Sequence, residues 1–253
     1  MSTRTAPGGQ MTLIEHLAEL RRRIIISILA IGAGGLVVTI FYNQILDLLV
    51  DPYCTATNRS GDACNLQLVD PTEGLGIRFK LTAYGGIAIA MPVILWQIWK
   101  FVSPGLYDNE KRYAWPFVTS ALGLFMLGAG LAYWTMPKAL QFLNTIGGQD
   151  FEVDYRPGPY ITLIAYMMLA FGAGFEFPIL LVFLMMAGIV EPATLRKYRR
   201  HAIVITAIVV AVITPSGDPI SMLALTIPMV VFYEIAILIG SWFKRRQAQQ
   251  VRR

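Results

Sequence analysis

The segment YITLIAYMMLAFGAGFEFPILLVFLMMAGIV, residues 160–190, sets the character of the chain. It is long and apolar enough to cross a hydrocarbon core of about 30 Å. Glu176 is its single charged residue, and insertion scales put the cost of a carboxylate at that depth at roughly 2.5 kcal/mol or more. The ring of Pro178 clashes with the carbonyl of Gly174 and removes one helix hydrogen bond. An acid beside a bend in a membrane span indicates a working site.

Composition places the chain among polytopic membrane proteins. Of its 253 residues, 55% are hydrophobic, and the mean hydropathy is +0.56. The two histidines, His16 and His201, lie far apart in the sequence. No His/Cys cluster has zinc-ligand spacing, no GxxxxGK is present for a nucleotide, and no GxGxxG follows a strand. The sequence therefore predicts a protein that is not an enzyme, with no cofactor and no metal site.

Charges separate onto two expected sides of the membrane. The basic side contains Arg21, Arg22, Arg23, Lys111, Arg112, Arg196, Lys197, Arg199, Arg200, Lys244, Arg245 and Arg246. The acidic side contains Asp47, Asp51, Asp62, Asp70, Glu73, Asp150, Glu152 and Asp154. This is the positive-inside pattern, which sets topology and does not indicate a nucleic-acid surface.

Six apolar segments predict an all-α, polytopic membrane protein, a single integral membrane domain over 1–253 with both termini cytoplasmic. The expected spans are 24–42, 75–101, 113–136, 160–190, 201–214 and 220–243. Residues 1–12 are expected to form a disordered cytoplasmic arm, and 244–253 a basic cytoplasmic tail. We expect the last two helices to be short, because 201–214 offers only about 21 Å of helix at 1.5 Å per residue.

The expected outer loop, residues 43–73, contains a predicted interfacial helix near 45–49, ended by Asp51-Pro52, and both cysteines. Cys54 and Cys64 bracket a polar turn on the side of the membrane where oxidation is allowed. A disulfide between them would close this turn and be worth about 3 kcal/mol at most. Two free thiols are the alternative, because bridging needs a Cα separation that the sequence does not specify.

Four motifs follow one another along the six spans. They are HLAELRRR (16–23), FVSPGLY (101–107) with EKR (110–112), FEFP (175–178), and TPSGDP (214–219) leading into IPM (227–229). Together they resemble the TatC family, the polytopic receptor subunit of the twin-arginine protein translocase. The resemblance implies a signal-peptide site made of Glu19, Arg21, Arg22, Phe101 and Glu110.

The resemblance also implies a contact within the membrane between Glu176, beside Pro178, and a single-span partner. Asp218 matches the acid of the last extracytoplasmic turn, and the segment PSGD carries one residue more than the family pattern. Met222 stands where well-known members have a glutamine, so no polar role is carried over to it. The cysteine pair is not part of the general family pattern.

The residues themselves leave alternatives open. A twin-arginine peptide presents two guanidinium groups, each suited to a carboxylate such as Glu19 or Glu110. Ordinary surface ion pairing with neighbouring bases, worth about 0–1 kcal/mol, is the plainer interpretation. Glu176 is a satisfied polar group within the bundle, a proton relay, or an acceptor for a partner helix. Asp218 is equally well explained as a cap of the last helix.

The resemblance implies a receptor and core scaffold that exports folded proteins across the cytoplasmic membrane of a prokaryote, driven by the proton gradient. Its expected partners are twin-arginine signal peptides, single-span TatA/TatB-type subunits, membrane lipid and further copies of itself. The main alternative is a proton-coupled secondary transporter of small molecules that uses Glu176 and Asp218. The lack of an internal repeat argues mildly against this alternative. An intramembrane hydrolase is disfavoured because no base is plausibly placed beside Ser103, Ser216 or Ser221.

Overall fold

The computed structural model describes residues 13–57, 66, 68, 70–102, 114–147, 155–186 and 188–251. These residues form helices joined by turns, which confirms the predicted all-α class for the described part of the chain. The helices are α1 (Leu13–Ile40), α2 (Tyr42–Thr57), α3 (Glu73–Val102), α4 (Ala114–Gly147), α5 (Pro157–Phe175), α6 (Phe177–Met186), α7 (Pro192–Lys197), α8 (Arg199–Ile213) and α9 (Pro219–Val251). The predicted arm, residues 1–12, lies outside the described residues.

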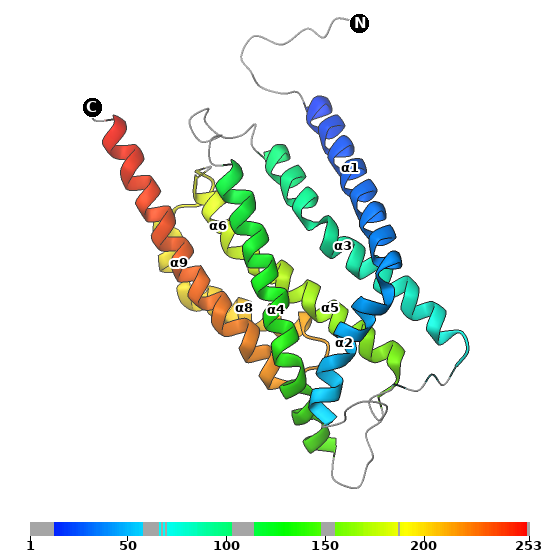
Figure 1. Ribbon diagram of the computed structural model, residues 1–253. Coiled ribbons are helices and arrows are strands. Elements are labelled where there is room, and N and C mark those ends of the chain that lie inside the picture. Colours follow the sequence, from blue (N-terminus) through cyan, green and yellow to red (C-terminus); the bar gives the residue numbers. More distant parts are fainter. Residues whose placement is uncertain are drawn as a thin grey trace, which may run out of the picture.

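Five helical segments of the described chain are long and apolar enough to cross a membrane. They are Ile14–Ile40, Glu73–Phe101, Trp115–Ile146, Pro157–Met186 and Pro219–Lys244. Figure 1 shows the long helices gathered into one bundle, with the start of α1 and the end of α9 at the same end. We call this the α1 end. The last residues of α3 and the first of α4 also lie there, whereas α2 lies toward the opposite end (Figure 1).

The prediction that the last two helices are short holds for α8 and is wrong for α9. α8 has 15 residues, about 22 Å of helix, and falls short of a full crossing. α9 has 33 residues and contains Pro228 without ending there. Proline is tolerated inside membrane helices when neighbouring groups satisfy the freed backbone. The helix also continues through the predicted basic tail to Val251.

α1 and α3 lie against each other at glycine contacts. A Cβ on Gly86 of α3 would lie 2.9 Å from the carbonyl oxygen of Ile31, and one on Gly34 of α1 would lie 2.7 Å from the carbonyl oxygen of Gly86. Small residues allow two membrane helices to approach this closely. Because the helices are joined along their length, the start of α1 is held beside the end of α3.

The opposite side of α1 is apolar and exposed. Large aliphatic side chains, among them Ile28, Leu29, Leu36 and Ile40, are exposed on it. Lipid tails are as apolar as leucine, so a membrane helix gains little by burying such residues in protein. This pattern suits a helix with one face on α3 and the other on lipid.

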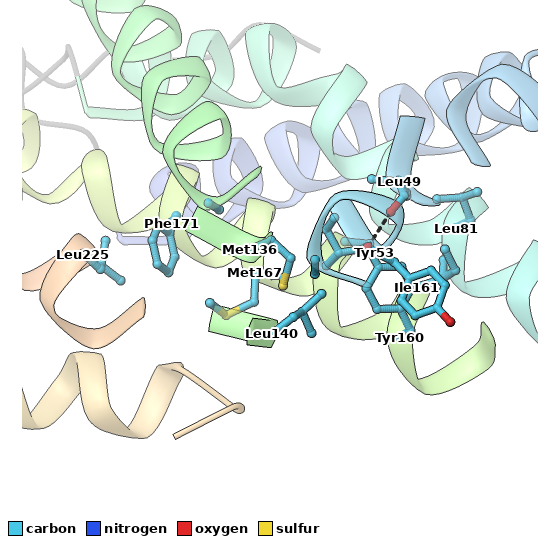
Figure 2. Close-up of a cluster of buried hydrophobic side chains, with 14 of the residues drawn as sticks. Leu49, Tyr53, Leu81, Met136, Leu140, Tyr160, Ile161, Met167, Phe171 and Leu225 are labelled. Atoms are coloured by element: carbon cyan, nitrogen blue, oxygen red, sulfur yellow. Dashed lines mark hydrogen bonds between the residues drawn. The ribbon is translucent and has the colours of Figure 1, made fainter. Parts of the chain in front are cut away.

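The core joins α2, α4, α5 and α9. Figure 2 shows Tyr53 and Leu49 of α2 beside Tyr160 of α5, with Leu225 of α9 at the other side of the cluster. Tyr160 is only 2% exposed, and its hydroxyl donates to the carbonyl oxygen of Leu49 at 2.8 Å. A buried hydroxyl needs such a partner, because leaving it unsatisfied costs about 1–3 kcal/mol.

The interfacial helix predicted near 45–49 extends well beyond its expected end. α2 runs through Pro52 to Thr57. Pro52 has no N–H for the carbonyl of Leu48 four residues earlier. The hydroxyl of Tyr133 in α4 donates to that carbonyl oxygen at 3.1 Å. Because a side chain from another helix satisfies the freed carbonyl, the helix does not stop at the proline.

The third span also extends beyond its expected end. α4 runs to Gly147 with Pro137 inside it, whereas the third span is predicted to end at residue 136. Leu140, in this extension, is part of the hydrophobic core. Near the end of the helix, Asn144 accepts a hydrogen bond from the hydroxyl of Tyr155 at 2.5 Å. Tertiary packing therefore carries the helix beyond its predicted boundary.

Candidate functional site

Side chains of α1 and α3 meet at the α1 end. The ring of His16 stacks on Phe101, with centroids 4.5 Å apart and planes 21° from parallel. Further along α1, Nη2 of Arg23 donates to Oε1 of Glu19 at 2.5 Å. Nη1 of Arg23 reaches across to α3 and donates to Oε1 of Gln97 at 3.2 Å. We call these five residues the α1–α3 polar cluster.

The ion pair in this cluster is largely withdrawn from solvent and incompletely satisfied. The side chains of Glu19 and Arg23 are 17% and 21% exposed, and Gln97 is 8% exposed. Oε2 of Glu19 and Nε of Arg23 are buried and make no hydrogen bond within the described part of the chain. A charge-assisted donor is the partner that a desolvated carboxylate oxygen favours. The cluster can therefore accept a further cationic group.

The structure brings together two of the predicted signal-peptide residues, Glu19 and Phe101, at the α1 end. Arg21 and Arg22 are exposed, and Glu19 pairs with Arg23, one helical turn later, in place of either of them. The i,i+4 spacing on a helix is the sequence signal that would have found Arg23. Gln97 had no local signal, because it is 74 residues away from Arg23 in sequence. Glu110 lies outside the described residues.

Glu176 lies at a break between α5 and α6. Its N–H bonds to the carbonyl oxygens of Ala173 and Gly174 in a tightened last turn of α5. Pro178 lies in the first turn of α6, where a missing N–H costs little. The predicted bend is therefore a break between two helices that together form one apolar span. Oε1 of Glu176 is buried and has no hydrogen-bond partner among the residues that the structure describes.

A hollow of about 560 Å³ lies beside this break, lined by residues of α3, α5, α6, α8 and α9. Gly174 and Phe177, on either side of Glu176, are part of its lining. Most other lining residues are aliphatic, such as Ile205, Val209 and Leu225. An apolar hollow beside the helix break that holds Glu176 suits an apolar helix that carries one polar side chain.

Asp218 caps α9. Its Oδ1 accepts from the N–H of Ser221 at 2.6 Å, and its Oδ2 accepts from the hydroxyl of Ser216 at 2.5 Å. Asp218 is only 1% exposed, with Pro219 as the first residue of the helix. Gly217, before it, has a φ of 59° and so takes the left-handed conformation that favours glycine. These contacts give Asp218 the capping role that the sequence left open.

Two ion pairs connect the ends of α7 and α8 with α9. Arg199 donates to Glu234 at 2.7 Å, and Lys244 donates to Glu191 at 2.8 Å. The hydrogen bond and charge of Lys244 hold the pKa of the Glu191 carboxyl below its usual value. Because both pairs are substantially exposed, each contributes little stability.

Cys54 lies near the end of α2 and is disulfide-bonded. Cys64 lies outside the described residues, so the bridge between the two stays a prediction. Among the described residues, no group of three or more His, Cys, Asp or Glu side chains is placed to hold a metal ion.

Comparison with known proteins gives one consistent result. The family model for TatC, the Sec-independent protein translocase protein, matches residues 15–228. The chain is 39% identical over 256 residues to the Sec-independent protein translocase protein TatC of Frankia casuarinae, covering 98% of this chain and 70% of that protein. It is 37% identical over 242 residues to the TatC of Aquifex aeolicus, covering 94% of this chain and 98% of that one.

Solved structures agree with the sequence comparisons. The crystal structure of the twin-arginine translocase receptor TatC matches with a TM-score of 0.75 and 37% sequence identity, over 90% of this chain and 99% of that chain. A second crystal structure of this receptor, in DDM, matches with a TM-score of 0.76 and the same identity of 37%.

Proposed function

The chain belongs to the TatC family of Sec-independent protein translocase proteins, and we propose that it is the signal-peptide receptor and core scaffold of such a translocase. The family is a non-enzymatic family of membrane proteins. We place the chain in the cytoplasmic membrane of a prokaryote, with six crossings and both termini in the cytoplasm. In this arrangement α8 is the short fifth crossing, and the α1 end faces the cytoplasm.

One observation carries the receptor role. Glu19 is a carboxylate at the α1 end with one oxygen, Oε2, that is buried without a hydrogen-bond partner among the described residues. A guanidinium of a twin-arginine signal peptide supplies the planar, charged donor that this oxygen lacks. Phe101, stacked on His16 nearby, offers an aromatic face for the same peptide. Arg21, Arg22 and Glu110 complete the proposed site.

Glu176 supports the scaffold role. Its neighbours Gly174 and Phe177 line an apolar hollow, and a single-span subunit of the TatA/TatB type fits there if its helix presents one polar donor to Glu176. Asp218 contributes by holding the turn that leads α9 back along this hollow. The chain also assembles with further copies of itself. The proton gradient supplies the energy for the export of folded cargo.

The receptor role is tested by the binding of a fluorescently labelled twin-arginine signal peptide to the purified full chain in lipid nanodiscs. We expect a twin-lysine peptide to bind more weakly by about tenfold, the worth of one charge-assisted hydrogen bond. Glu19→Gln and Glu110→Gln should each weaken the twin-arginine peptide by about tenfold or more.

Glu234→Gln is the matched control, because it removes a carboxylate that is also paired with an arginine, Arg199, at 2.7 Å. It should leave peptide affinity unchanged. Equal affinity for both peptides, together with no effect of Glu19→Gln, would show that the chain is not the receptor.

A further inference from the structure

The Glu19–Arg23 pair is bonded through only one of its two available contacts. A carboxylate and a guanidinium that meet side-on form two parallel hydrogen bonds, one to each oxygen. Here only Nη2 and Oε1 are bonded, at 2.5 Å. Nε of Arg23 and Oε2 of Glu19, which a side-on pair would join, are both buried without partners within the described residues. The pair therefore leaves a donor and an acceptor unsatisfied although each could satisfy the other.

Gln97 restrains Arg23 from the side of α3. Its Oε1 accepts a hydrogen bond from Nη1 of Arg23 at 3.2 Å. Gln97 is 8% exposed, on a helix that glycine contacts hold against α1. Arg23 is therefore held by α3 as well as by Glu19, and in this position its Nε and Oε2 of Glu19 are not joined. A guanidinium is a rigid fork, so a bond that holds Nη1 restricts the orientations in which Nε and Nη2 can meet both oxygens of Glu19.

We propose that Gln97 is a positioning residue that holds the Glu19–Arg23 pair open, so that Glu19 can accept a guanidinium of the signal peptide. Without Gln97, Arg23 closes on Glu19, satisfies both buried atoms and occupies the carboxylate with a guanidinium of the chain itself. Arg23 is thus an internal competitor of the peptide, and Gln97 limits its competition. This inference rests on the proposed receptor function.

The alternative role for Gln97 is structural, as a bond that fastens α1 to α3. The two roles differ in what happens when Arg23 is also removed. If Gln97 only fastens the helices, removing Arg23 as well cannot repair its loss. If Gln97 restrains a competitor, removing the competitor restores binding. A double-mutant cycle separates these cases, because residues that act through each other are not additive.

The experiment measures the affinity of the labelled twin-arginine peptide for the full chain in nanodiscs, with Gln97→Leu, Arg23→Gln and the double variant beside the unchanged protein. Gln97→Leu should weaken binding about tenfold, because the peptide must then displace a charge-assisted bidentate pair. The double variant should return to within about twofold of the unchanged protein. Affinity for Gln97→Leu equal to that of the unchanged protein, or a double variant as weak as Gln97→Leu, overturns the proposal.

Gln97→Glu keeps the test decisive if Gln97→Leu does not fold. Glutamate retains the acceptor for Arg23 and adds a charge that strengthens its hold, so peptide affinity should equal or exceed that of the unchanged protein. Weaker binding overturns the proposal. If the unchanged protein binds no twin-arginine peptide, the receptor function itself fails, and this result is distinguishable because it precedes any variant.

Discussion

Glu19 and Glu176 each have one carboxylate oxygen that is buried and accepts no hydrogen bond from the described residues. Such groups are rare in folded proteins, because each costs about 1–3 kcal/mol. The two acids differ in their neighbours. The other carboxylate oxygen of Glu19 accepts a hydrogen bond from Arg23, whereas no ion pair is found for Glu176 within the described chain. In the proposed function, Glu19 therefore exchanges one cation for another, whereas Glu176 gains a first polar partner.

Replacing Glu176 should change the stability of the isolated protein and its assembly with a partner subunit in opposite directions. Glu176→Leu removes a buried acceptor that has no partner, so the isolated protein should gain about 1 kcal/mol of stability. Copurification with a single-span partner subunit should be lost, because the proposed hydrogen bond between Glu176 and the partner helix can no longer form. Thermal unfolding in detergent and affinity copurification measure the two effects.

Glu176→Gln is the control for this prediction, since it keeps a hydrogen-bonding group and should retain part of the copurification. A Glu176→Leu protein that is less stable than the unchanged one would indicate that Glu176 is satisfied within the bundle.

Prolines act differently at the starts and in the interiors of these helices. Pro157, Pro192 and Pro219 each begin a helix, where no N–H is needed. Pro52 lies inside α2, and the carbonyl it leaves free is satisfied by Tyr133 of another helix. Whether a proline ends an element thus depends on which groups tertiary packing places beside it.

The contact between α2 and α4 gives a prediction about this compensation. Tyr133→Phe should destabilise the protein by about 1 kcal/mol, because the carbonyl of Leu48 loses its donor. In a Pro52→Ala background the cost should be smaller, since residue 52 then supplies an N–H to that carbonyl.

Tyr160→Phe is the control. The Tyr160 hydroxyl donates to the carbonyl of Leu49, which also accepts from the N–H of Tyr53 four residues later in the helix, so Pro52→Ala should not alter the cost of Tyr160→Phe. Chemical denaturation in micelles measures all four values. Equal costs of Tyr133→Phe in both backgrounds would show that Tyr133 does not replace the missing backbone bond.

The start of α9 gives a second prediction about an element. Asp218→Ala removes the cap of the Ser221 N–H and should cost about 1 kcal/mol, the usual worth of an N-cap. Asp218→Asn keeps an acceptor oxygen and should lose less. If Asn and Ala variants melt at the same temperature, the cap does not stabilise the helix.

As a whole, the molecule separates its proposed contacts along the bundle. The α1–α3 polar cluster lies at the α1 end, whereas the capped turn before α9 follows the far end of α8. Glu176 lies within the apolar span Pro157–Met186, beside a hollow lined by five helices. α8 is only 15 residues long, which corresponds to about 22 Å of helix. Such a helix spans a bilayer only where the membrane is thin or the helix end is sheltered.

The proposed six-span topology predicts how single cysteines will be labelled in intact cells after Cys54 and Cys64 are replaced by serine. Pro215→Cys, in the exposed turn between α8 and α9, should react with a membrane-impermeant thiol reagent added outside. Arg196→Cys, in α7 just before α8, should react only after the cells are opened. Reaction of both residues from the same side would show that α8 does not cross, leaving the five long spans that the described chain displays.

The sequence by itself determined the class of the protein, its apolar spans, the short fifth segment and the family. Hydropathy and local motifs depend only on residues that are close together in the sequence. It also singled out Glu19, Phe101, Glu176 and Asp218 as candidates. Only the tertiary structure decided their partners. Arg23 is joined to Gln97 across 74 residues of sequence, and Tyr133 compensates for Pro52 from another helix. Contacts of this kind depend on how helices pack against each other, and no local pattern in the chain encodes which side chain will stand opposite which.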